Sequence, residues 1–178
     1  MAAQAPPAQW IETLADGSRV TIRPVRSADV ARNAAFIAAL SPASKHYLFL
    51  GGISQLTEPA LRRLCDPDYA HDMAYIALVT DNTGTQHQVG VCRYAGADPE
   101  AGAEISVAVA DDWQNKGLGR SLLRHLIDFA RTRGVKRLYS MDAIGNGRMR
   151  ALARTIGFVE RRDPDDVRQV IYSLDLQT

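Results

Sequence analysis

Cysteine is scarce in this chain, and so are aromatic residues, long apolar runs and any excess of one charge. Its two cysteines, Cys65 and Cys92, have no cysteine or histidine at metal-ligand spacing, so we expect small buried thiols in a reducing compartment. The formal net charge of +1 argues against a nucleic-acid or membrane partner. Without a membrane-length apolar run or a signal-like N-terminus, the expected location is cytoplasmic.

The remaining composition is ordinary for one domain. The chain has 178 residues, of which 46% are hydrophobic and 23% charged, enough for one sizeable core. Residues 1–9 are rich in Ala, Pro and Gln and are predicted to be a disordered tail. Residues 10–178 contain no repeat or linker, so they are predicted to form one domain, either a monomer or a homodimer.

Alternating strand and helix patterns predict an α/β fold with a mixed sheet. Ser27, Thr57 and Asn146 are candidate helix caps, and Asp16-Gly17 suits a hairpin turn. Strands are predicted over 10–14, 18–25, 73–80, 88–95, 103–113, 135–142, 158–162 and 168–176. Helices are predicted over 28–39, 57–65, 118–133 and 147–156, and residues 41–52 are predicted to form a loop or a short helix.

The segment QNKGLGRS, Gln114 to Ser121, lies between a predicted strand and an amphipathic helix. A helix start leaves about four backbone N–H groups unpaired, and with the helix dipole they form an anion site. Gly117 and Gly119 would let an anion approach the backbone, and Lys116 and Arg120 add positive charge. The order of residues differs from a Walker loop and from a dinucleotide fingerprint. Taken alone, the segment also fits a plain strand-to-helix turn.

Three blocks, in order along the chain, carry a family resemblance: ADGSRVTIRPVRSAD, AEISVAVADDWQNKGLG and NGRMRALARTIGF. The Gln-x-x-Gly-x-Gly pattern of the middle block resembles the coenzyme A loop of the GNAT N-acetyltransferase superfamily. Together the blocks look most like bacterial Pat-type protein lysine acetyltransferase domains. The resemblance implies a splayed central sheet flanked by helices, with acetyl-CoA as the acyl donor.

The resemblance also implies how the donor is held. The coenzyme A pyrophosphate would lie on the loop backbone, the pantetheine arm would pair with the preceding strand, and the capped helix would face the donor. The implied residues are Gln114, Asn115, Lys116, Gly117, Leu118, Gly119, Arg120 and Ser121 in the loop, Val107 and Val109 on the strand, and Asn146 at the cap.

Two catalytic assignments follow from the resemblance. Glu104 occupies the position of the family's general base, and burial would raise its pKa toward neutrality and suit it to that task. From its spacing alone, Glu104 also fits a strand-edge glutamate that faces solvent. The backbone N–H of Val107 would stabilise the developing oxyanion. Many members carry a tyrosine that protonates the leaving thiolate, but Ala153 stands there, so no general acid is assigned.

Other polar residues are weighed individually. His46 and Tyr47 lie where the family often receives its acceptor. Asp142 either binds a cationic acceptor or caps the next turn. His125 is predicted to be solvated on the outer face of its helix. The acidic segment 66–72 is more typical of a polar loop than of a metal site, and no metal is predicted.

Three functions remain open. The leading hypothesis is acetyl transfer from acetyl-CoA to a protein lysine by direct attack in a ternary complex. The second is acetylation of a small amine such as a polyamine, amino acid or drug, because fold alone does not fix the acceptor. The third is a non-catalytic acyl-CoA-binding module.

Overall fold

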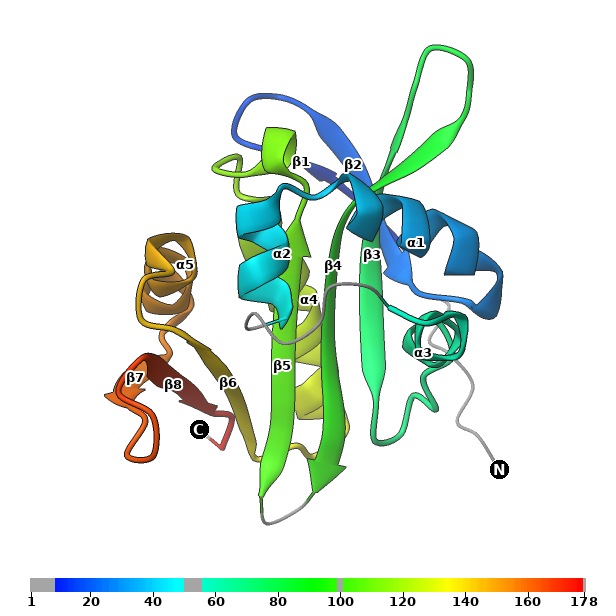
Figure 1. The fold of residues 1–178 in the computed structure, drawn as a ribbon. Helices are drawn as coiled ribbons and strands as arrows, with labels where there is room; N and C mark the ends of the chain where they lie inside the picture. The colour runs from blue at the N-terminus through cyan, green and yellow to red at the C-terminus, as the bar shows by residue number, and fades with distance from the viewer. Residues whose placement is uncertain (1–8, 50–55, 99–100, 178) are drawn as a thin grey trace.

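A mixed sheet forms the centre of the molecule (Figure 1). The computed structural model describes residues 9–49, 56–98 and 101–177, so the predicted disordered tail lies outside the described residues except for Gln9. Over the described part, eight strands are ordered β1-β2-β3-β4-β5-β6-β8-β7. The strands are β1 Trp10–Thr13, β2 Arg19–Pro24, β3 Met73–Thr80, β4 Gln86–Asp98, β5 Gly102–Val109, β6 Arg137–Ala143, β7 Val159–Arg162 and β8 Gln169–Asp175.

Helices cover both faces of the sheet. The helices are α1 Val30–Ala39, α2 Pro42–Phe49, α3 Glu58–Leu64, α4 Leu118–Thr132 and α5 Gly147–Ile156, with short 3-10 turns at Ser27–Asp29 and Asp111–Trp113. Buried residues of α1 pack with β3 on one face, whereas α4 and α5 pack on the other. Figure 1 shows α2 in front of β5 and α4 behind it.

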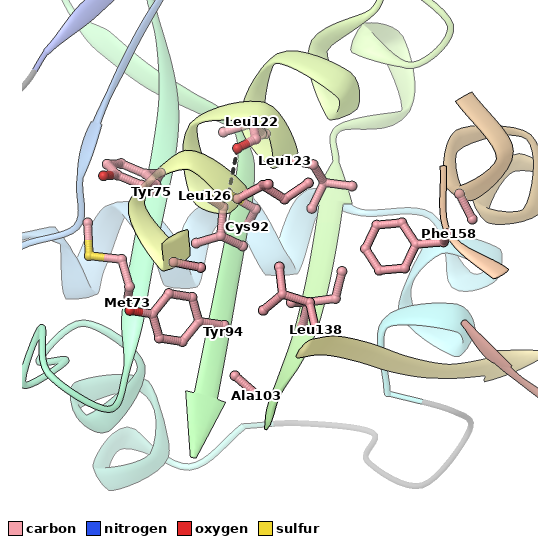
Figure 2. Close-up of a cluster of buried hydrophobic side chains, with 14 of the residues drawn as sticks. Met73, Tyr75, Cys92, Tyr94, Ala103, Leu122, Leu123, Leu126, Leu138 and Phe158 are labelled. Atoms are coloured by element: carbon pink, nitrogen blue, oxygen red, sulfur yellow. Dashed lines mark hydrogen bonds between the residues drawn. The ribbon is translucent and has the colours of Figure 1, made fainter. Parts of the chain in front are cut away.

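The larger core lies between α4 and the sheet (Figure 2). Leu122, Leu123 and Leu126 are each 0% exposed, and Cys92 donates its thiol hydrogen to the Leu122 carbonyl oxygen at 3.4 Å. Burying one leucine side chain contributes roughly 1.5–3 kcal/mol. The prediction that apolar residues form one face of this helix is therefore confirmed. Their burial holds α4 against the centre of the sheet.

The sheet opens between β5 and β6. All other neighbouring strands are antiparallel, but β5 and β6 are parallel and pair only at Ala103 with Leu138 and at Glu104 with Tyr139. Beyond Glu104 the two strands diverge, as Figure 1 shows. β5 stays with β4 as far as Val109, whereas β6 follows β8. The predicted α/β fold with a splayed central sheet is confirmed.

Three local predictions are wrong. Ser27 does not cap α1; it lies in a 3-10 turn whose start is held by Asp29, which accepts the Arg26 N–H at 2.9 Å. The predicted strand 103–113 ends at Val109, because the chain turns where the Asp111 carboxylate accepts hydrogen bonds from Ser41, just before α2, and from Ser44 within it. His125 is buried at 9% exposure, because the β1–β2 hairpin covers that side of α4.

The predicted caps of α3 and α5 are confirmed. Thr57 accepts the Ala60 N–H through its hydroxyl oxygen at 3.4 Å, and Asn146 accepts the Met149 N–H at 3.1 Å. The Asp16-Gly17 turn is also confirmed, since Gly17 has a φ of 84°. Residues 42–49 of the segment predicted as a loop or short helix form α2; residues 50–52 lie outside the described residues.

Candidate functional site

A cavity of about 440 Å³ occupies the opening between β5 and β6. It is bounded by α2, β5, the loop before α4, the first turn of α4, the end of β6 and α5. Most of the predicted site residues line it: Glu104, Val107, Val109, Gln114, Asn115, Gly117, Leu118, Gly119, Arg120 and Asn146. Lys116 and Ser121 are not among the lining residues.

The free edge of β5 faces this cavity. Ala110 donates its N–H to the Val89 carbonyl oxygen of the neighbouring strand segment at 2.9 Å. Hydrogen-bonded and non-hydrogen-bonded pairs alternate along an antiparallel ladder, so the backbone groups of Val107 and Val109 point away from β4. The Val109 carbonyl oxygen accepts from Nε2 of Gln114 at 3.0 Å. An extended chain could therefore pair with β5 where β6 has departed.

Backbone amides at the start of α4 face the same cavity. Gly117 is the N-cap residue at φ 88°, a conformation that side-chain-bearing residues rarely adopt, and no side chain caps the helix. The first helical hydrogen bond runs from the Ser121 N–H to the Gly117 carbonyl oxygen at 3.1 Å. The N–H groups of Leu118, Gly119 and Arg120 therefore lack helical acceptors and provide an anion site.

Gly119 leaves room where α4 approaches α5. A Cβ atom at this position would lie 3.2 Å from Cδ2 of Leu152 and 3.8 Å from Cγ2 of Val109. The missing side chain thus keeps open the space between the first turn of α4, the end of β5 and α5.

Lys116 is directed away from the cavity toward the β1–β2 hairpin. Its ammonium nitrogen lies 3.0 Å from Oδ2 of Asp16 and 4.7 Å from the centre of the Trp113 ring. A hydrogen bond from the Ser18 N–H and another from Lys116 lower the pKa of Asp16 to about 2. Ser121 lines a second hollow beside Lys116 and Arg120. The charge of Lys116 is therefore largely compensated within the protein.

Two carboxylates line the cavity in different surroundings. Glu104 is exposed rather than buried, because its neighbours Ala103 and Ile105 point into the α4 core and Glu104 points to the opposite, α2 face. The carboxylate therefore faces solvent, and burial does not tune it in the protein alone. Asp142, at the end of β6, is only 6% exposed. Burial raises its pKa, although hydrogen bonds from Asn146 and from the Ala143 N–H oppose the shift.

Helix α2 connects the two sides of the opening, a feature that the sequence analysis did not identify. The Asp111 carboxylate accepts hydrogen bonds from Ser41 and Ser44, and Tyr47 donates its hydroxyl to the Gly145 carbonyl oxygen at 3.4 Å. Ser41 also accepts the Ser44 N–H at 3.2 Å. The Ser-Pro pair at the helix start was the available signal. Tyr47 lines the cavity, whereas His46 is exposed outside it.

The acidic segment 66–72 organises its own loop. The Asp68 carboxylate accepts the backbone N–H groups of Ala70, His71 and Asp72. Over the described residues, no group of three or more His, Cys, Asp and Glu side chains could hold a metal ion. Over the same residues, no helix is long and apolar enough to cross a membrane.

Comparison with known proteins decides the family. The sequence model of the acetyltransferase (GNAT) family matches residues 45–158. Acetyltransferase PA5475 of Pseudomonas aeruginosa is 46% identical over 167 residues, which cover 94% of this chain and 89% of that relative. The chain belongs to the GNAT acetyltransferase family. The family predicted from the motifs is thereby confirmed, and this GNAT acetyltransferase is an acyl-CoA-dependent acyltransferase.

Other relatives agree with this assignment. The GNAT domain of S. lividans PAT superposes with a TM-score of 0.86 at 24% identity, covering 97% of this GNAT acetyltransferase and 99% of that chain, which shows the shared fold. The [ribosomal protein bS18]-alanine N-acetyltransferase of Salmonella typhimurium is 46% identical over 56 residues, 32% of this chain and 38% of that relative. GNAT enzymes generally use acetyl-CoA as the acyl donor.

Proposed function

We propose that this enzyme transfers the acetyl group of acetyl-CoA to a lysine side chain of a protein by direct attack in a ternary complex. One observation supports the binding of acetyl-CoA: two stretches of backbone with unpaired polar groups lie along the same cavity. The amides of residues 118–120 would hold the diphosphate, and the outward carbonyl of Val107 and the outward N–H of Val109 would pair with the peptide-like pantetheine arm.

The shape of the cavity fits such a donor. The β5 edge and the α4 amides lie along the same opening, and Gly119 keeps the space between them clear. Asn146 faces this opening from the start of α5. Gln114 supports the arrangement indirectly, because its side chain holds the Val109 carbonyl rather than pointing freely at a ligand.

Glu104 would supply the base. A free lysine amine has a pKa of about 10.4, and its deprotonation at pH 7 costs roughly 4–5 kcal/mol. Glu104 lines the cavity and would accept the proton as the amine nitrogen bonds to the acetyl carbon and the carbon–sulfur bond breaks. The Val107 N–H would donate to the acetyl oxygen. Ala153 offers no acid, but a thiol pKa near about 8.5 makes the thiolate an adequate leaving group.

The exposure of Glu104 favours a large acceptor. The carboxylate lies on the α2 face of β5, in an opening that solvent reaches, so an extended lysine side chain can approach while its protein stays outside. The Pat-like sequence blocks point to the same acceptor class. A small amine would not need this exposure, although it would fit.

The test is acetylation of candidate proteins, beginning with acyl-CoA ligases, read as acetyl-lysine by mass spectrometry. We expect transfer by the wild-type enzyme and a loss of at least about tenfold in rate for Glu104→Gln with coenzyme A binding retained. A parallel thiol-release screen over small amines gives the comparison. Transfer to small amines alone, with no acetylated protein, would contradict the lysine assignment.

A second acceptor is favoured by one specific observation. The 56-residue match to a bS18-alanine N-acetyltransferase suggests the terminal amine of a protein instead of a side chain. A terminal amine has a pKa of about 8, so its deprotonation demands less of Glu104. Mass spectrometry that places the acetyl group on an N-terminal alanine, and on no lysine, would replace the leading proposal with this one.

A further inference from the structure

Asp142 is a buried carboxylate for which the transfer chemistry has no direct use. It lies at the end of β6, lines the cavity and is only 6% exposed. Its Oδ1 accepts the Ala143 N–H at 2.7 Å, and its Oδ2 accepts from Nδ2 of Asn146 at 3.0 Å. Burying a carboxylate is costly unless it is hydrogen-bonded, so its position calls for a reason.

The side chain of Asn146, the partner of Asp142, is hydrogen-bonded through both its amide oxygen and its amide nitrogen. Oδ1 of Asn146 accepts the Met149 N–H at 3.1 Å, and Nδ2 donates to Asp142. A backbone N–H can only donate, so the oxygen of Asn146 must face the helix and its nitrogen must face Asp142. With the helix bond alone, the planar amide could still turn about that contact. The second bond, to Asp142, removes this freedom.

One hydrogen of Asn146 is left over. Nδ2 carries two hydrogens, and Asp142 takes one of them. Within the described part of the chain, no recorded hydrogen bond uses the other. Asn146 is half-buried and lines the cavity between β5 and α5. The fixed amide therefore has one N–H available to whatever occupies the cavity.

We infer that Asp142 is a positioning residue that locks Asn146 so that its free N–H donates to a carbonyl oxygen of the bound acyl-CoA. This inference rests on the proposed function, because the carbonyl belongs to the donor assigned there. Asp142 itself does not touch the donor. Its role is to select the orientation in which Asn146 recognises an acceptor atom.

A purely structural role for the pair makes a different prediction. If Asp142 served only to tie the turn after β6 to the start of α5, any hydrogen-bonded pair at these two positions would suffice. The exchange variant Asp142→Asn/Asn146→Asp separates the two roles. In this variant the asparagine at position 142 would still accept the Ala143 N–H and would donate to the aspartate at position 146. That aspartate would still accept the Met149 N–H.

The exchange therefore restores the bonds within the protein but removes the donor from the cavity. We expect Asp142→Asn alone to lower both the melting temperature and the affinity for coenzyme A, because two amide nitrogens would then face each other. We expect the exchange variant to recover the melting temperature while coenzyme A binding stays about tenfold weaker than wild type, the loss of one hydrogen bond of about 1.4 kcal/mol.

Calorimetry gives the affinity for coenzyme A, and thermal melts of the same samples give the melting temperature. Neither measurement requires that the acceptor substrate be known. Asn146→Ser is the uncharged control: serine still caps α5 but does not reach as far as asparagine, so weaker binding with an intact fold is expected. Wild-type affinity in the exchange variant, or in a folded Asp142→Asn protein, would overturn the inference. Failure of the wild-type enzyme itself to bind coenzyme A would instead contradict the proposed function.

Discussion

Replacing Gly119 by alanine separates ligand binding from folding at the first turn of α4. The new methyl group would lie 3.2 Å from Cδ2 of Leu152 and would enter the space between α4, β5 and α5. Alanine is favoured over glycine in a helix by about 1 kcal/mol, which offsets the tight contact with one flexible leucine. We therefore expect the melting temperature to stay within about 4 °C of wild type.

Coenzyme A binding should change much more. The methyl group would keep a phosphate from approaching the helix amides to the roughly 2.8 Å typical of charge-assisted hydrogen bonds. Each such bond contributes about 1.5–3 kcal/mol, so loss of one predicts a dissociation constant about 10- to 150-fold higher.

Isothermal titration of wild type, Gly119→Ala and Gly147→Ala with coenzyme A provides the assay. Gly147 is the matched control, because it begins α5 and a Cβ atom there would meet nothing within 4 Å. We expect Gly147→Ala to bind like wild type. Unchanged affinity in a folded Gly119→Ala protein would refute the claim that this space admits the diphosphate.

The remaining predictions concern stability. Leu126→Ala should cost about 3–5 kcal/mol in the free energy of unfolding, measured by urea denaturation, because this leucine is fully buried; a loss under 1 kcal/mol would contradict the core described here. His125→Ala should cost about 1–3 kcal/mol by removing the stack on Trp10 at 4.0 Å, with coenzyme A affinity unchanged; weakened binding would contradict its purely structural role. Burial alone would raise the pKa of Asp29, but hydrogen bonds from Arg23 and the charges around it lower the pKa overall. The stabilising contribution of Asp29 is therefore present above about pH 4 and lost at lower pH. The difference in free energy of unfolding between wild type and Asp29→Asn should shrink as the pH falls below about 4. A constant difference from about pH 7 to about pH 3 would refute this.

The donor side of the site follows closely from local sequence. The change from strand to helix around residues 114–121, together with two glycines, predicts free amides at a helix start, and the structure places these amides at the cavity. Asn146 likewise carries its cap signal in its own segment. Such features depend on neighbours within a few positions, so the pattern contains the information needed to predict them.

The features that were missed depend on residues far apart in the chain. His125 has the spacing of a surface position on α4, and only the packing of Trp10 and the bond to Glu12 bury it. Lys116 is basic and adjacent to the glycines, yet Asp16 on the N-terminal hairpin draws it away from the cavity. Sequence periodicity within one helix or loop carries no information about either partner.

Backbone amide chemical shifts during a titration with coenzyme A report directly on the individual N–H groups that would hold the donor. We expect the amide signals of Leu118, Gly119, Arg120 and Val107 to shift in a saturable manner and to be among the most strongly affected in the protein. Saturation of binding with these four signals unmoved would contradict this expectation.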